Sequence, residues 1–96
     1  TRNESLPMIQ QSITISNKLG LHARASAKLT KLAGSFPCEV WISRGSRRVN
    51  AKSIMGVMML AAGIGTEVTL ETDGEREAEA MQALVALFED KFGEGE

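Results

Sequence analysis

The sequence changes from loop to helix within one stretch that also holds the only histidine, Asn17-Lys18-Leu19-Gly20-Leu21-His22-Ala23-Arg24-Ala25-Ser26-Ala27-Lys28-Leu29. A helix that begins at or just after His22 places the imidazole beside backbone N–H groups that lack an intrahelical partner. Arg24 then falls in the same first turn. Such a corner suits an anion, phosphate above all, and we expect the chemistry of the chain to lie here.

Hydrophobic alternation on either side of this stretch predicts the neighbouring elements. Residues 8–15 place apolar side chains at period two and predict a strand with one mostly apolar face, made by Ile9, Gln11, Ile13 and Ile15. After the turn at residues 17–20, helical spacing over residues 22–33 predicts an amphipathic helix with Gly34 as its C-terminal cap. Its core-facing residues are Ala25, Leu29, Leu32 and Ala33, while Lys28 and Lys31 are expected to face water.

The second half of the chain continues in the same way. Residues 38–43 alternate and predict a strand, residues 44–47 a hairpin turn, and residues 48–51 an antiparallel returning strand. Ser53 as N-cap and Gly63 as a stop predict a short helix over residues 54–62. Residues 67–72 predict the last strand, and a long helix from about residue 75 to residue 91 carries one apolar stripe, Ala78, Met81, Leu84, Val85, Phe88 and Phe92.

This order of strand, helix, strand, strand, helix, strand, helix predicts an α+β fold. We expect a two-layer open-faced β-sandwich, in which a largely antiparallel four-stranded sheet carries three helices on one side. Residues 8–92 are expected to form a single domain. Residues 1–7 are expected to be extended or disordered, and residues 93–96 to form a flexible tail.

Composition narrows the possible partners and cofactors. Eleven basic residues against 12 acidic ones give a net charge of −1, so the overall charge of the chain does not favour binding to nucleic acid or to an anionic membrane. Cys38 is the only cysteine, which excludes an internal disulfide and fits a reducing compartment. No apolar run approaches the roughly 20 residues of a membrane span, and no signal pattern opens the chain, so we expect a cytoplasmic protein. One histidine and scattered carboxylates predict no metal or cofactor.

Gly20-Leu21-His22-Ala23-Arg24 resembles the active-site motif of the histidine-containing phosphocarrier family of the phosphoenolpyruvate-dependent phosphotransferase system. The segment Lys52-Ser53-Ile54-Met55-Gly56-Val57 resembles the start of that family's second helix, and the element order is similar over almost the whole chain. One residue departs from the pattern, because Ala25 stands where family members usually have proline. Both the sugar-transport and the nitrogen-related branches commonly carry that proline. Residues 52–57 are more similar to the sugar-transport members, and the nitrogen branch is the alternative.

The resemblance implies a carrier rather than a stand-alone enzyme. His22 would accept phosphoryl on Nδ1 from an enzyme I-type kinase charged by phosphoenolpyruvate and pass it to an enzyme IIA-type protein. From the residues themselves, an imidazole is partly unprotonated near neutrality, and Arg24 and the first-turn amides can stabilise the charge of a transferring phosphoryl group. Gly20, Ala23 and Ala25 would support this site. The alternative for His22 is an ordinary capping residue.

Ser53 is a second candidate site, because kinase-regulated members of the family are phosphorylated at the serine before this Ile-Met-Gly run. The other interpretation of Ser53 is an ordinary helix cap. The helix that follows carries more apolar side chains than it can bury on one face, so we expect some of Ile54, Met55, Met58 and Met59 to form an adaptable docking surface. A fully buried helix is the alternative.

Two other classes of function compete with the carrier. A regulatory interaction module would dock through the methionine surface without using phosphate. A nucleic-acid-binding domain is disfavoured by the net charge and by the few aromatic residues on the strands. The basic residues Arg44, Arg47, Arg48 and Lys52 either steer acidic partners or form a solvated hairpin. We expect a monomer.

Overall fold

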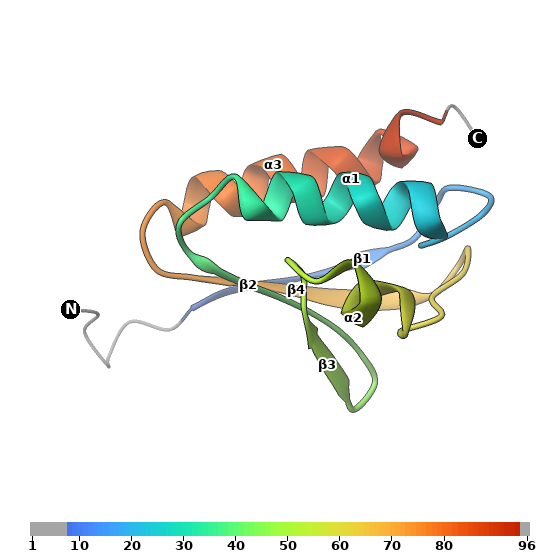
Figure 1. Cartoon of the computed structure of the whole chain (residues 1–96), viewed down its shortest axis with the longest axis horizontal. Coiled ribbons are helices and arrows are strands. Elements are labelled where there is room, and N and C mark those ends of the chain that lie inside the picture. Colours follow the sequence, from blue (N-terminus) through green and yellow to red (C-terminus); the bar gives the residue numbers. More distant parts are fainter. Residues whose placement is uncertain (1–7, 95–96) are drawn as a thin grey trace.

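A computed structural model describes residues 8–94; the predicted N-terminal segment 1–7 and residues 95–96 of the predicted tail lie outside the described residues. The elements follow the predicted order, with one additional 3₁₀ turn at the end (Figure 1). In chain order they are β1 (Ile9–Thr14), α1 (Ala23–Gly34), β2 (Glu39–Arg44), β3 (Arg47–Asn50), α2 (Ile54–Met58), β4 (Glu67–Asp73), α3 (Glu77–Glu89) and η1 (Lys91–Gly93).

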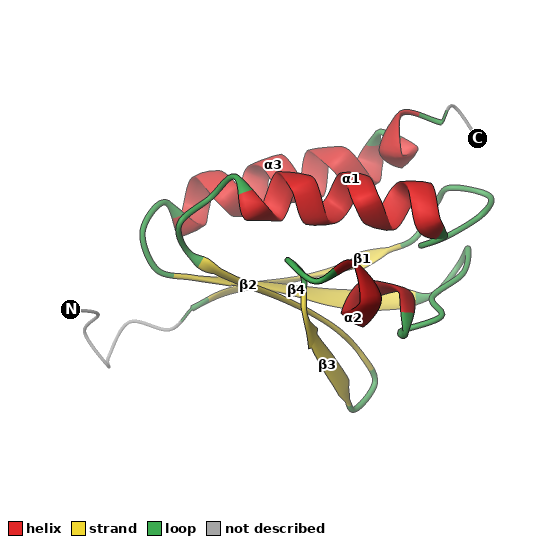
Figure 2. Ribbon diagram, in the orientation of Figure 1, coloured by secondary structure: helices red, strands yellow, loops and turns green. Residues whose placement is uncertain are grey.

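The four strands form one sheet in the order β1-β4-β2-β3, and every neighbouring pair is antiparallel. In the two pairings that β4 makes, Thr72 of β4 lies opposite Ile9 of β1 and Val40 of β2. Helices α1 and α3 pack side by side over one face of this sheet, and α2 packs against α1 and β3 (Figures 1 and 2). The predicted open-faced α+β arrangement is confirmed.

The core lies between the sheet and the helices. The alternation predicted for β2 is confirmed, since Val40 and Ile42 are fully buried. From the helix layer, Leu29 of α1 and Leu84 of α3 are fully buried against the same cluster. Burial of each such side chain contributes roughly 1.5–3 kcal/mol relative to exposure. This packing fixes where α1 begins and therefore where His22 lies.

Two helix ends differ from the sequence prediction. Gly34 is the last residue of α1 rather than its cap, and Ser35 caps the helix by donating its N–H to the Leu32 and Ala33 carbonyls. The predicted helix over residues 54–62 is wrong beyond Met58. Arginines from the β2–β3 hairpin, Arg44 and Arg47, donate to the carbonyls of residues 59–61 in place of further helical hydrogen bonds.

The C-terminal region departs most from the prediction of one continuous helix over residues 75–91. Arg76 has φ 64°, so α3 begins only at Glu77, and the helix ends at Glu89. Lys91 and Phe92 have φ 52° and 56°, which reverses the chain and buries the Phe92 ring against Phe88, with 4.8 Å between ring centroids. At the start of the expected flexible tail, Gly93 ends η1 and the Glu94 side chain contacts His22.

Candidate functional site

His22 is the N-cap of α1, with extended backbone angles of φ −75° and ψ −178°. Its carbonyl accepts the Ser26 N–H at 2.8 Å, and its side chain Nδ1 accepts the Arg24 N–H at 3.3 Å. An imidazole thus replaces the usual Ser, Thr or Asp cap. Nδ1 therefore points at the first-turn amides, where the positive end of the helix dipole lies.

The turn before His22 requires glycine at position 20. Gly20 has φ 65°, and a Cβ built there would lie 2.5 Å from the Ala62 carbonyl oxygen. The same oxygen accepts the Leu21 N–H at 2.9 Å. The predicted tight turn is confirmed, and it is held against the segment that follows α2.

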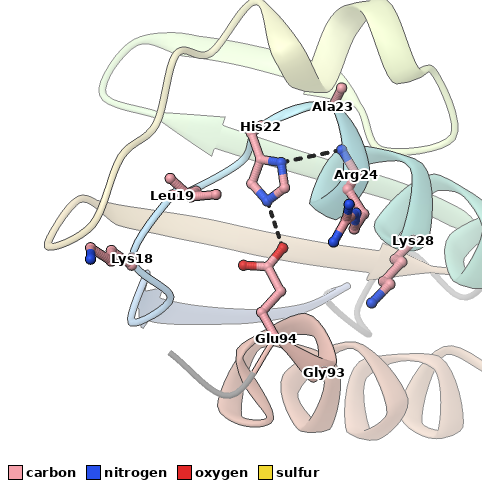
Figure 3. A pocket seen from close by; sticks show the side chains of 8 residues that line it. All are labelled: Lys18, Leu19, His22, Ala23, Arg24, Lys28, Gly93 and Glu94. Atoms are coloured by element: carbon pink, nitrogen blue, oxygen red, sulfur yellow. Dashed lines mark hydrogen bonds and ion pairs between the residues drawn. The ribbon is translucent and has the colours of Figure 1, made fainter.

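The C-terminal end of the described chain reaches the other nitrogen of the imidazole. His22 Nε2 lies 2.5 Å from Glu94 Oε2 (Figure 3). Asn17 Nδ2 donates to Glu94 Oε1 at 3.1 Å. The hydrogen bond from His22 lowers the pKa of the Glu94 carboxyl; burial opposes this, while the Asn17 hydrogen bond and the charges of His22 and Lys28 add to it. Because a backbone N–H can only donate to Nδ1 and a carboxylate can only accept from Nε2, the neutral ring carries its proton on Nε2.

An open pocket of about 700 Å³ surrounds this histidine. Three basic side chains line it, with Lys18 on the loop and Arg24 and Lys28 on α1 (Figure 3). The full lining is Lys18, Leu19, His22, Ala23, Arg24, Lys28, Gly93 and Glu94. A pocket lined by cations, beside the N-terminal amides of a helix and a ring nitrogen that accepts a hydrogen bond, suits a phosphoryl group.

The supporting residues named from the sequence divide into two kinds. Ala23 lines the pocket and is exposed, whereas Ala25 is fully buried beneath the first turn. Ser26 is buried as well, and its hydroxyl donates to the Leu21 carbonyl at 3.0 Å, which ties the loop to the helix. The structure gives Ser26 a local structural contact.

Sequence reasoning missed three polar residues of the site, Asn17, Lys28 and Glu94. Lys28 remains exposed as predicted, but it also lines the pocket and donates its Nζ to the Phe92 carbonyl at 2.6 Å. Its position four residues after Arg24 was a usable signal, since i and i+4 share a helix face. Glu94 had no comparable signal, because its approach depends on the left-handed turn at Lys91 and Phe92.

The predicted apolar surface after Ser53 is exposed. Met55 and Met59 are 68% and 61% exposed, and Ile54 and Met58 are each 40% exposed, while Val57 alone of α2 is buried. Ser53 is the N-cap of α2, and its Oγ accepts the Gly56 N–H at 3.2 Å. The Leu21–Ala62 hydrogen bond keeps this surface next to the His22 loop.

The basic residues of the hairpin have structural partners. Arg44 and Arg47 bond backbone carbonyls, as described above, and Lys52 Nζ donates to the Phe36 carbonyl at 2.9 Å. Arg48 pairs with Glu71 at 2.6 Å, and its guanidinium lies 4.1 Å from the centre of the half-exposed Trp41 ring. These contacts favour a structural interpretation of the basic set.

Comparison with known proteins identifies the family. The family model described as the PTS HPr component phosphorylation site matches residues 9–90. The chain belongs to the HPr family. Phosphocarrier protein HPr of Cupriavidus necator is 70% identical over 89 residues, which cover 93% of this chain and 100% of that protein. The chain is therefore a phosphocarrier of the phosphotransferase system, and its relatives are carriers rather than stand-alone enzymes.

Solved HPr structures share the fold. The crystal structure of HPr-C-His from Thermoanaerobacter tengcongensis has a TM-score of 0.88 and 46% identity, covering 91% of this chain and 98% of that one. A structure described as an HPr dimer from the same organism has a TM-score of 0.73 and 48% identity, and the match covers 85% of this chain and 94% of that one. Within residues 8–94, no helix is long and apolar enough to cross a membrane, and no cluster of three His, Cys, Asp or Glu side chains could hold a metal ion.

Proposed function

We propose that His22 is the phosphoryl acceptor of this HPr-family chain and that the phosphoryl group is carried on Nδ1. The observation that supports this most strongly is the N-cap geometry, in which Nδ1 accepts the Arg24 N–H, faces the first-turn amides and opens into a basic pocket. A nucleophile in that position needs no separate base, because its lone pair is already available.

In the proposed transfer, the Nδ1 lone pair forms a bond to phosphorus while the bond between phosphorus and the donor's leaving atom breaks. The Arg24 N–H, which now donates to Nδ1, becomes free to donate to a phosphoryl oxygen. Ala25, the third residue of α1, has a backbone N–H that a proline at this position would lack. The Arg24 guanidinium and the Lys28 ammonium add charge that opposes the negative charge on the outer oxygens.

We propose that the donor is an enzyme I-type kinase charged by phosphoenolpyruvate and that the acceptor is an enzyme IIA-type protein. Both would dock on the apolar surface made by Ile54, Met55, Met58 and Met59, beside the His22 loop. Flexible, polarisable methionines suit a surface that must receive more than one partner in turn. We further propose that the protein is a cytoplasmic monomer. The similarity of residues 52–57 to the sugar-transport members of the family supports a role in the sugar-transport branch of the phosphotransferase system.

Ser53 is proposed as a regulatory phosphorylation site for a serine kinase. Its side chain is exposed at the start of α2, so a kinase can reach it, and the N-terminus of a helix accommodates a phosphate dianion. The added charge would adjoin the apolar docking surface. Ser53→Asp should therefore slow phosphoryl transfer while leaving the fold intact, and Ser53→Ala should transfer normally.

Incubation with enzyme I and phosphoenolpyruvate tests the proposed site. Wild type should gain one acid-labile phosphate, His22→Ala none, and Arg24→Ala should gain it more slowly, by about tenfold or more for one lost charged donor. A second HPr that enzyme I is known to phosphorylate serves as the positive control. Phosphate on His22→Ala would contradict the proposal, and so would an unphosphorylated wild type when the control is phosphorylated.

The docking surface is tested separately with Met55→Glu and a matched control, Gln82→Glu, which adds the same charge on the exposed side of α3. Met55→Glu should raise the concentration of carrier needed for half-maximal transfer, whereas the control should not. Equal behaviour of the two variants would place docking elsewhere.

A further inference from the structure

We propose that Glu94 is a positioning residue that holds the proton on His22 Nε2 throughout the phosphoryl-transfer cycle. This inference rests on the proposed function of His22 and deepens it. It assigns a task to the C-terminal turn, which otherwise contributes only to packing.

The Glu94 carboxylate is held from both sides. Asn17, itself fully buried, donates one amide hydrogen to Glu94 Oε1 at 3.1 Å and the other to the Gly20 carbonyl at 2.8 Å. The backbone that leads to Glu94 is fixed as well, because the Phe92 ring is buried and the Phe92 carbonyl accepts a hydrogen bond from Lys28 Nζ. The side chain of Glu94 is only 12% exposed. The carboxylate is thus built into the mouth of the pocket.

The charges around the ring make this carboxylate necessary. Lys18 from the loop and Arg24 and Lys28 from α1 line the pocket and favour a bound phosphoryl group. The same cations disfavour a positive imidazole ring. Glu94 is the one acidic side chain among the residues that line the pocket. Its negative charge therefore stabilises a positive charge on the imidazole ring, while the three cations remain available to the phosphoryl oxygens.

The reaction requires a proton on Nε2 in both directions. When the Nδ1 lone pair bonds to phosphorus, a ring that keeps its Nε2 proton becomes a phosphorylated imidazolium, and its positive charge faces Glu94. When the P–Nδ1 bond breaks toward the acceptor, the electron pair returns to Nδ1 and the leaving group is a neutral imidazole. Loss of the Nε2 proton beforehand would make the leaving group an imidazolate, which is a far poorer one. Glu94 keeps the ring in the form that accepts and releases phosphoryl readily.

The first test uses the unphosphorylated protein labelled with [¹⁵N]histidine, where His22 gives the only signals. Wild type should show an Nε2–H resonance that is shifted downfield and exchanges slowly with water. Glu94→Ala should lose that resonance, whereas Glu94→Gln should keep it, because a carboxamide oxygen can still accept the hydrogen bond. Glu89→Gln, an exposed residue at the end of α3, is the matched control and should resemble wild type.

The second test follows the ³¹P chemical shift of the phosphorylated protein against pH. The midpoint of that titration should fall by about 0.5 pH unit in Glu94→Gln, as expected for loss of one partly screened charge, and should not move in Glu89→Gln. An unprotected Nε2–H in wild type, or an equal midpoint in all variants, would overturn the proposal. If enzyme I phosphorylates no variant, the proposed function fails, while the ¹⁵N result still decides whether Glu94 holds the Nε2 proton.

Discussion

The turn that presents His22 should not tolerate a side chain at position 20, and a second glycine provides the control. Gly20 and Gly45 have nearly the same backbone angle, φ 65° and 60°. A Cβ at Gly45 meets nothing within 4 Å, whereas a Cβ at Gly20 lies 2.5 Å from the Ala62 carbonyl oxygen and 2.6 Å from the Gly63 Cα. The two alanine variants therefore share the cost of left-handed backbone and differ in the clash.

The magnitudes follow from these two contributions. Left-handed backbone costs an alanine about 1–2 kcal/mol relative to glycine, so Gly45→Ala should lose that amount of unfolding free energy. The contacts at Gly20 involve backbone atoms, which cannot rotate away. Displacing packed groups adds about 1–3 kcal/mol, so Gly20→Ala should lose about 2–5 kcal/mol in total.

Urea unfolding followed by far-ultraviolet circular dichroism measures this difference, with the fluorescence of Trp41, the single tryptophan, as a second probe. Both variants should keep the wild-type dependence on urea concentration, and the midpoint of Gly20→Ala should lie below that of Gly45→Ala. Equal midpoints within error would contradict this prediction, because they would show that the loop can move away from Ala62 at little cost.

Three further predictions concern the sheet, the C-terminal turn and the departure from the family motif. Burial raises the pKa of the Glu71 carboxyl, but hydrogen bonds from Arg48 and Gln10 and the charge of Arg48 outweigh it, so the pKa is lowered in the folded state. The unfolded chain then binds more protons in acid, so the unfolding free energy falls as the pH drops below about 4.3. Urea midpoints measured against pH should fall less steeply in Glu71→Gln than in wild type. An equally steep fall in both proteins would contradict this prediction. Phe92→Ala should lower the unfolding free energy by about 3 kcal/mol through loss of a buried ring and its contact with Phe88, and a change below about 1 kcal/mol would mean that the turn is not packed as described. Ala25→Pro should raise the unfolding free energy by about 0.4–1 kcal/mol by restricting the unfolded chain, and a calorimetric scan showing a lower melting temperature would contradict this.

The sequence was most informative where structure is determined locally. Alternation in residues 38–43 predicted a strand, and its apolar residues Val40 and Ile42 are buried. The predicted start of α1 just after His22 and the predicted N-cap of α2, Ser53, are confirmed. These features depend on spacing and on side chains within one turn of the chain, which a single sequence displays directly.

The features that sequence reasoning missed depend on contacts between distant residues. Apolar residues continue past Met58, yet α2 ends there because arginines from a hairpin 12 to 17 residues away bond the exposed carbonyls. Phe88 and Phe92 have the i, i+4 spacing of a continuing helix, but Lys91 and Phe92 adopt left-handed backbone and Lys28 bonds the Phe92 carbonyl. The contact between Glu94 and His22 spans 72 positions in the sequence and follows from that reversal.

His22 is proposed to carry the phosphoryl group on Nδ1, the nitrogen that caps α1. Because the chain has a single histidine, selective labelling with [¹⁵N]histidine gives signals from that residue alone. After phosphorylation by enzyme I and phosphoenolpyruvate, the one-bond coupling between ³¹P and ¹⁵N identifies the nitrogen that holds the phosphoryl group. The geometry predicts coupling to Nδ1, with Nε2 still protonated. Coupling to Nε2, or phosphate on the protein without coupling to either nitrogen, would contradict the claim.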